Sequence, residues 1–201
     1  MRSRSPDPVE PRVPWRERLL DVPDDVPRLA LYGRLAGFAL MAVWGTSVLL
    51  SRMTDTPTLL HLTVILFHEA GHIVFSPFGE ALRVAGGTLG QLLMPLVCAV
   101  ALHRNDDNFG AALATAWLGM SGMDAAVYAF DAANPVLPLI GGGTGADRFH
   151  DFIFLFERYG QLHHARGWAI AIKALGALAL YASLAWAAVL LFRQSERLDD
   201  R

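Results

Sequence analysis

Long apolar runs, separated by short charged or proline-rich segments, constrain this chain more than any other feature. A helix of about 20 apolar residues is long enough to cross the hydrocarbon core of a bilayer. Candidate runs cover residues 29–50, 57–78, about 81–102, about 109–130 and 168–192. Only 18% of the residues are charged, against about 25% in soluble domains. The sequence therefore predicts an all-α, polytopic membrane helix bundle with about five transmembrane helices.

The polar segments divide the chain around this transmembrane helical domain, which covers residues 29–192. Residues 1–28 are rich in Pro, Arg and Asp and lack an apolar run, which predicts a flexible N-terminal cytoplasmic extension. Its "WRERLL" is a candidate for lying on the membrane surface. Residues 131–167 form a polar loop in which "DRFHDFIFLFERYGQL" predicts a short interfacial helix. Residues 193–201 form a polar C-terminal tail.

The distribution of arginines predicts an orientation. Five spans place the termini on opposite sides, and the side of the N-terminus then carries ten arginines against five on the other side. The ten are Arg2, Arg4, Arg12, Arg16, Arg18, Arg28, Arg83, Arg148, Arg158 and Arg166, and the five are Arg52, Arg104, Arg193, Arg197 and Arg201. Because arginines are enriched on the cytoplasmic side, we expect the N-terminus and the 131–167 loop in the cytoplasm, in what is most simply a bacterial inner membrane.

Three ionisable residues stand in the middle of the second apolar run, where hydrocarbon disfavours them. The stretch "HEAGH" matches H-E-x-x-H, with His68 and His72 on one face of a helix and Glu69 beside them. Two imidazoles at this spacing can bind one metal ion, and Zn²⁺ suits them because it accepts imidazole nitrogen and acidifies its bound water. Glu69 would act as the general base for that water and as the acid for the departing amine.

A catalytic zinc usually has three protein ligands, so the sequence must supply one more. His150 is the preferred candidate, with Asp151 as an outer-shell partner and a less favoured ligand. Asp131 is the second candidate and Asp124 the third. The two aspartates belong to a polar stripe that should face the bundle interior or a wet cavity: Trp117, Ser121, Asp124, Tyr128 and Asp131.

Two further features near the motif leave alternatives open. His61 shares the face of His68 but lies about 10 Å from it by helix rise, too far to bind the same ion. We interpret it as a polar group near the opposite interface, with a proton-relay role as the alternative. Gly86, Gly87 and Gly90 indicate a helix-packing face or exposed backbone beside the site.

An H-E-x-x-H motif within a membrane span resembles the site-2 protease family of intramembrane zinc metalloproteases. The resemblance implies zinc held by His68 and His72, with Glu69 as the catalytic carboxylate. That family takes its third ligand from an L-D-G motif, which does not occur in this sequence. From about residue 60 to 162 the chain also resembles a group of multi-span bacterial H-E-x-G-H proteins, through "HEAGH", "GGTLGQ", "YAFDA", "LPL" and "FHDF". This second resemblance adds weight to Asp131, His150 and Asp151 but implies no activity.

The sequence therefore predicts an intramembrane zinc metallopeptidase that cleaves a peptide bond in or near the bilayer. The alternative is a non-catalytic metal-binding membrane subunit of a larger complex. The expected partners are the lipid bilayer and a membrane-protein substrate or partner subunit. The net charge of -2 and the lack of a basic cluster argue against nucleic acid.

Overall fold

The structure is a computed structural model, which describes residues 14–24, 26–55, 58–139 and 142–199. The expected all-α class is confirmed, since the described residues contain helices and no strand. The α-helices are α1 (Trp15–Leu19), α2 (Arg28–Leu50), α3 (Thr58–Phe75), α4 (Glu80–Arg104), α5 (Asn108–Asp131), α6 (Asp151–Arg158) and α7 (Ala165–Asp199). Two 3₁₀ turns, η1 (Ser76–Phe78) and η2 (Leu162–His164), precede α4 and α7.

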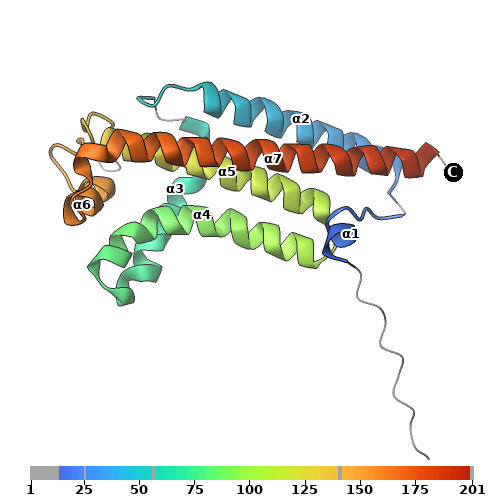
Figure 1. Ribbon diagram of the computed structural model, residues 1–201, viewed down its shortest axis with the longest axis horizontal. Coiled ribbons are helices and arrows are strands. Elements are labelled where there is room, and N and C mark those ends of the chain that lie inside the picture. Colours follow the sequence, from blue (N-terminus) through green and yellow to red (C-terminus); the bar gives the residue numbers. More distant parts are fainter. Residues whose placement is uncertain (1–13, 25, 56–57, 140–141, 200–201) are drawn as a thin grey trace, which may run out of the picture.

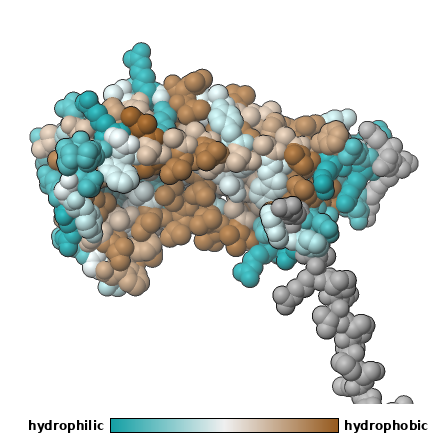
Figure 2. Space-filling model, viewed as in Figure 1, coloured by the Kyte–Doolittle hydropathy of each residue, from teal (hydrophilic) through white to brown (hydrophobic). Residues whose placement is uncertain are grey.

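Four helical stretches of the described chain are long and apolar enough to cross a membrane. They cover Arg28–Leu50, Leu59–Phe78, Glu80–Arg104 and Leu162–Leu198. On the face shown in Figure 2, apolar residues form a broad band across the middle, and hydrophilic residues gather at the two ends. Large apolar side chains of the long helices, such as Leu40, Leu66, Val97 and Leu178, are exposed, as expected of surfaces that meet lipid rather than water. The chain thus has the character of an integral membrane protein.

Helix α5 is the central helix of the bundle and is not among these four. Most of its residues are buried, and many are Ala or Gly. Small residues allow close helix approach: a Cβ at Gly119 would lie 2.7 Å from the backbone nitrogen of Leu180 in α7. Because α5 is covered by its neighbours, it does not need the strongly apolar surface that a lipid-facing helix needs.

Helix α3, which carries H-E-x-x-H, runs across the bundle rather than along it. Figure 1 shows it passing from the α2 side of α5 and α7 to the start of α4. Its N-terminal half packs into the core, where Leu60 and Val64 join Met120 and Leu180. Its C-terminal half packs against α4 at the glycines discussed below. Helix α3 therefore begins and ends in the same half of the molecule.

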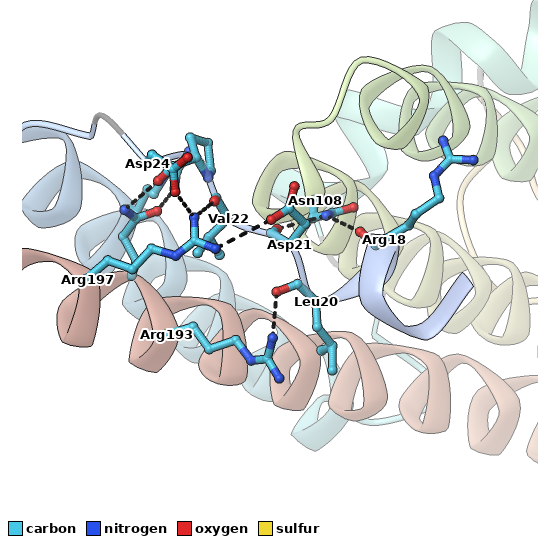
Figure 3. Close-up of polar contacts among 11 residues, drawn as sticks. Arg18, Leu20, Asp21, Val22, Asp24, Asn108, Arg193 and Arg197 are labelled. Carbon is cyan, nitrogen blue, oxygen red and sulfur yellow. Dashed lines mark hydrogen bonds and ion pairs between the residues drawn. The ribbon is translucent and has the colours of Figure 1, made fainter. Parts of the chain in front are cut away.

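The N-terminal segment and the end of α7 lie at the other end of the bundle, together with the start of α5. The side chain of Asn108 donates to the backbone oxygens of Arg18 and Asp21 at 2.7 and 2.9 Å. Arg193 donates to the oxygen of Leu20 at 3.1 Å, and Arg197 binds the oxygen of Val22 and the carboxylate of Asp24 (Figure 3). The described part of the N-terminal extension is thus packed, whereas we expected it to be flexible; residues 1–13 lie outside the described residues.

This arrangement does not support five complete crossings. Helix α2 runs antiparallel to α7, since Arg34 binds Gln194 at 2.9 Å and Lys173 donates to the oxygen of Ser51 at 2.8 Å. The start of α2, the start of α5 and the end of α7 therefore share one end of the molecule. An odd number of crossings would separate the termini. Helix α3 has the length and composition of a spanning helix but lies across the bundle (Figure 1).

Candidate metal centre

Three ligand-type side chains meet where α3 passes the start of α6. The Nε2 atom of His68 lies 3.0 Å from Oδ2 of Asp151, and the Nε2 atom of His72 lies 3.3 Å from the same oxygen. Together these residues form a group that could hold a metal ion, with their ligand atoms within 4.8 Å of one another. His68 and Asp151 are buried and His72 is partly buried. The i, i+4 spacing predicted the convergence of the two histidines, which the structure confirms.

The environment of His68 fixes which of its ring nitrogens carries the proton. Its Nδ1 lies 2.8 Å from Oε1 of Gln91 in α4. The amide nitrogen of Gln91 donates to the backbone oxygen of Ser121 at 3.0 Å, and a backbone oxygen can only accept. The orientation of the amide is therefore set, and Oε1 must accept a proton from Nδ1 of His68. In the neutral ring, Nε2 then carries a lone pair directed toward Asp151.

His72 is oriented in the same way by a different acceptor. Its Nδ1 lies 2.8 Å from the backbone oxygen of Arg83, so that nitrogen must be the donor. Two imidazole lone pairs and a carboxylate oxygen thus face one another at about hydrogen-bond distance. Such an arrangement repels itself unless a cation or additional protons lie between the groups. Outer-shell acceptors on Nδ1 that leave Nε2 free are the usual support of a metal-binding histidine.

Glycines of α4 make the room for this cluster. A Cβ on Gly87 would lie 2.6 Å from Nε2 of His72 and closer still to Nε2 of His68. Gly86 and Gly90 in α4 face the backbone of Gly71 in α3. A side chain on Gly86 or Gly90 would overlap the backbone of α3, and a side chain on Gly71 would overlap the backbone of α4. The helix-packing interpretation therefore holds for Gly86 and Gly90, whereas Gly87 lies beside the imidazoles with its backbone buried rather than exposed.

A cavity of about 930 Å³ opens onto the cluster. Glu69 lines it together with His68, His72 and Asp151. Glu69 is exposed, so its carboxylate is free to meet a molecule that enters. Much of the remaining wall is apolar: Leu62, Ile65, Val127, Leu137, Pro138, Leu139 and Phe149. The cavity can therefore hold a water or substrate next to both the histidines and the glutamate.

His150, the preferred third ligand from sequence, is placed elsewhere by the structure. Its Nδ1 accepts from the backbone nitrogen of Ile153 at 3.3 Å and caps α6, so the neutral ring carries its proton on Nε2. That Nε2 lies 3.4 Å from Oδ2 of Asp131. Asp151, which we expected to act behind His150, takes the position beside the two histidines. Adjacent residues at the start of a helix point in different directions, which the sequence alone does not resolve.

Asp131 and Asp124 also lie apart from the histidine pair. Oδ1 of Asp131 accepts from the backbone nitrogens of Val136 and Leu137 at 2.8 and 3.0 Å, which fixes the chain that leaves α5. Asp124 lies 3.3 Å from Nδ1 of His61 and lines the same cavity. His61 is thus paired with a buried carboxylate. We interpreted it as a polar group near the interface and did not predict this partner. The polar stripe of α5 faces the bundle interior, as predicted.

Three contributors were not recognised as site residues in the sequence: Gln91, described above, Tyr128 and Arg83. Tyr128 accepts the backbone N–H of Asp151 at 3.3 Å, and its ring lies 4.1 Å from that of His150. Arg83 supplies the oxygen that orients His72. Membership of the polar stripe could have indicated Tyr128. A backbone oxygen leaves no signal in the sequence, so the contribution of Arg83 could not be predicted.

The pKa values of His150 and Asp151, which lie outside the membrane-length helices, agree with a capping role for His150 and a ligand role for Asp151. Burial lowers the pKa of His150, which keeps its imidazole neutral near pH 7. Burial alone would raise the pKa of Asp151, but hydrogen bonds from His68 and His72, whose rings then carry the additional protons, outweigh burial and hold that pKa below its usual value. Asp151 is therefore a carboxylate, the form that binds a cation.

Comparisons with family models, with curated proteins and with solved structures found no match to this chain. The resemblances described above therefore rest on the motifs alone.

Proposed function

We propose that this protein is an intramembrane zinc metallopeptidase whose ligands are His68, His72 and Asp151. The observation that carries the proposal is the orientation of the two imidazoles. Acceptors at Nδ1 of both rings turn both Nε2 lone pairs toward one carboxylate oxygen of Asp151. Two imidazoles and one carboxylate are a ligand set of catalytic zinc sites, in which the remaining position is left to water.

The residues around the cluster suit hydrolysis. Zinc in this position supplies a Lewis acid that makes a water acidic near neutral pH. Glu69 takes a proton from the attacking water and returns it to the nitrogen of the departing amine. Gln91 and the backbone of Arg83 hold the imidazoles in place, and Tyr128 holds the backbone of Asp151. The apolar wall of the cavity excludes bulk water and favours an apolar stretch of peptide.

We also infer that α2, α4, α5 and α7 cross the membrane, whereas α3 lies within one half of it. The 24 residues of α5 extend about 36 Å at 1.5 Å per residue, enough for the hydrocarbon core. Four crossings place both termini on one side, which agrees with the contacts of the described N-terminal segment with α7. Helix α6 and the metal centre then lie at the opposite end.

The arginine count favours a cytoplasmic location for the termini. With four crossings, Arg104, Arg193, Arg197 and Arg201 join the six arginines that precede α2, which gives ten, while Arg52 joins Arg83, Arg148, Arg158 and Arg166, which gives five. Because arginines are enriched on the cytoplasmic side, the metal centre opens toward the other side. This reverses the location that the five-span prediction gave to residues 131–167 and keeps the N-terminus inside.

Substitution of Glu69 by Gln tests the activity. Zinc-loaded parent protein in detergent should cleave an apolar peptide library, with new termini identified by mass spectrometry. Glu69→Gln should retain about one zinc per chain and lose turnover by at least about 100-fold, the usual scale for a general base. Glu80→Gln, at an exposed glutamate that binds Arg158, is the matched control and should retain both.

The same experiment separates the alternative function. A parent protein that binds zinc but cleaves no more peptide than Glu69→Gln would favour a non-catalytic metal-binding membrane subunit. A parent protein that binds no zinc would overturn both functions.

A further inference from the structure

Two arginines line the cavity of the metal centre without an acceptor for their guanidinium groups among the described residues. Arg83 and Arg148 both contribute to the wall of the cavity that Glu69, His72 and Asp151 also line. Both side chains are exposed. Arg158, at the same end of the molecule, instead lies 3.5 Å from Glu80. An unpaired guanidinium that lines a cavity is suited to bind a carboxylate or phosphate that enters it.

Both arginines are attached to the metal centre through the chain. The backbone oxygen of Arg83 accepts from His72, and Arg148 lies three residues before Asp151. Neither can move far from the cluster while these residues keep their places. Both residues therefore start beside the cluster, and both line its cavity.

In the turn before Arg148, Gly143 lies against the side chain of Arg148. Gly143 has a φ of +79°, which favours glycine. A Cβ there would lie 3.1 Å from Nε and 3.3 Å from Cδ of Arg148. The turn closes through a hydrogen bond of 2.9 Å from Leu139 N to Gly143 O. Gly143 thus leaves room for the side chain of Arg148, which lines the cavity.

We propose that Arg83 and Arg148 bind the terminal carboxylate of a peptide, so that the site removes residues from the C-terminal end of an apolar chain. This inference rests on the proposed peptidase function. A carboxylate on the arginines brings the last peptide carbonyl toward the histidine cluster, and the apolar wall accepts the last side chains. Water adds across the C–N bond: its oxygen joins the carbonyl carbon, and Glu69 carries its proton to the released nitrogen. A phospholipid phosphate shares the anionic chemistry, but it would bring no peptide bond to the cluster.

Binding to a non-hydrolysing variant tests the proposal without requiring turnover. The probe is a fluorescent apolar hexapeptide in two forms, one with a free C-terminal carboxylate and one with a C-terminal amide. Zinc-loaded full-length Glu69→Gln in a neutral detergent should bind the acid at least about tenfold more tightly than the amide, since only the carboxylate accepts charge-assisted hydrogen bonds from the arginines. Arg83→Gln and Arg148→Gln in the Glu69→Gln background should each reduce this ratio toward one. Arg158→Gln is the matched control and should leave the ratio unchanged.

The outcomes are distinguishable from failure of the peptidase function. Equal binding of acid and amide, or binding of neither, overturns the role of the arginines, whatever the turnover of the parent protein. A preference for the acid that survives both substitutions overturns it as well. The last measurement adds phosphatidylglycerol to the micelles. If this lipid displaces the acid and the amide peptide equally, and does so only while both arginines are present, the arginines bind a lipid headgroup. That result would overturn the proposal.

Discussion

Gln91 holds His68 in a single orientation: its amide oxygen accepts from Nδ1 of the imidazole at 2.8 Å, while its amide nitrogen donates to the oxygen of Ser121 at 3.0 Å. The series of hydrogen bonds from Ser121 in α5 through Gln91 in α4 to His68 in α3 is buried. Through these bonds, the central helix α5 determines which nitrogen of His68 faces Asp151.

Loss of this amide should weaken metal binding without removing a ligand. Gln91→Met keeps a similar length but cannot accept a hydrogen bond of comparable strength, so His68 becomes free to change tautomer and rotate. Outer-shell losses of this kind cost about 10–100-fold in metal affinity, and we expect that range in a competition titration with a chelator. Gln161→Met, at a partly exposed glutamine near the start of α7, is the control and should leave the zinc affinity unchanged. An unaltered zinc affinity in Gln91→Met would show that the tautomer is fixed by other groups.

A side chain at Gly87 should damage the site from the opposite wall. In Gly87→Ala the new methyl group would lie 2.6 Å from Nε2 of His72, so the imidazoles must move apart. We expect zinc affinity to fall by about tenfold or more, because packed interiors absorb such overlap poorly. Gly33→Ala in α2 is the control, since nothing lies within 4 Å of its added Cβ. A Gly87→Ala protein that binds zinc like the control would mean that the imidazoles do not face α4 as described.

The His61–Asp124 pair should affect stability and leave the metal in place. Asp124 is buried, and His61 is its partner at 3.3 Å; removal of the imidazole leaves a buried carboxylate without that contact. His61→Ala should lower the free energy of unfolding by about 1–3 kcal/mol, measured by titration with sodium dodecyl sulfate. Asp124→Ala should cost less in the His61→Ala background than in the parent, as a double-mutant cycle reports. A loss of bound zinc from either variant would contradict this prediction and would indicate that Asp124 contributes to the metal site.

Topology gives a prediction that separates four crossings from five. Reporter fusions after residue 105 and after residue 160 should report opposite sides, with 105 in the cytoplasm together with the N-terminus and 160 outside. Five crossings from a cytoplasmic N-terminus predict the reverse for both fusions. If residue 160 and the N-terminus both prove cytoplasmic, the metal centre faces the cell interior and the placement of α3 within one half of the membrane is wrong.

Sequence reasoning reached the helical class and the histidine pair because both leave regular patterns. Membrane-length apolar runs predict helices, and the spacing of His68 and His72 places them on one face. The direction of α3 left no such pattern, since a helix that crosses the bundle and a helix that crosses the bilayer have the same composition. The choice between His150 and Asp151 depended on backbone geometry: His150 turns back to cap α6, and this turns Asp151 toward α3. Helix α5 was expected as a span on length, and its small residues are explained by its burial.

The identity of the third ligand is tested most directly by zinc affinity in a pair of neighbouring variants. His150→Asn keeps a good N-cap for α6 and removes the imidazole, whereas Asp151→Asn keeps the shape of the side chain and removes the negative charge. Competition titration of the full-length protein should show that Asp151→Asn loses zinc affinity by more than the 10–100-fold expected of an outer-shell group, and that His150→Asn stays within about threefold of the parent. The opposite result, with zinc lost from His150→Asn and retained by Asp151→Asn, would contradict the metal centre described here.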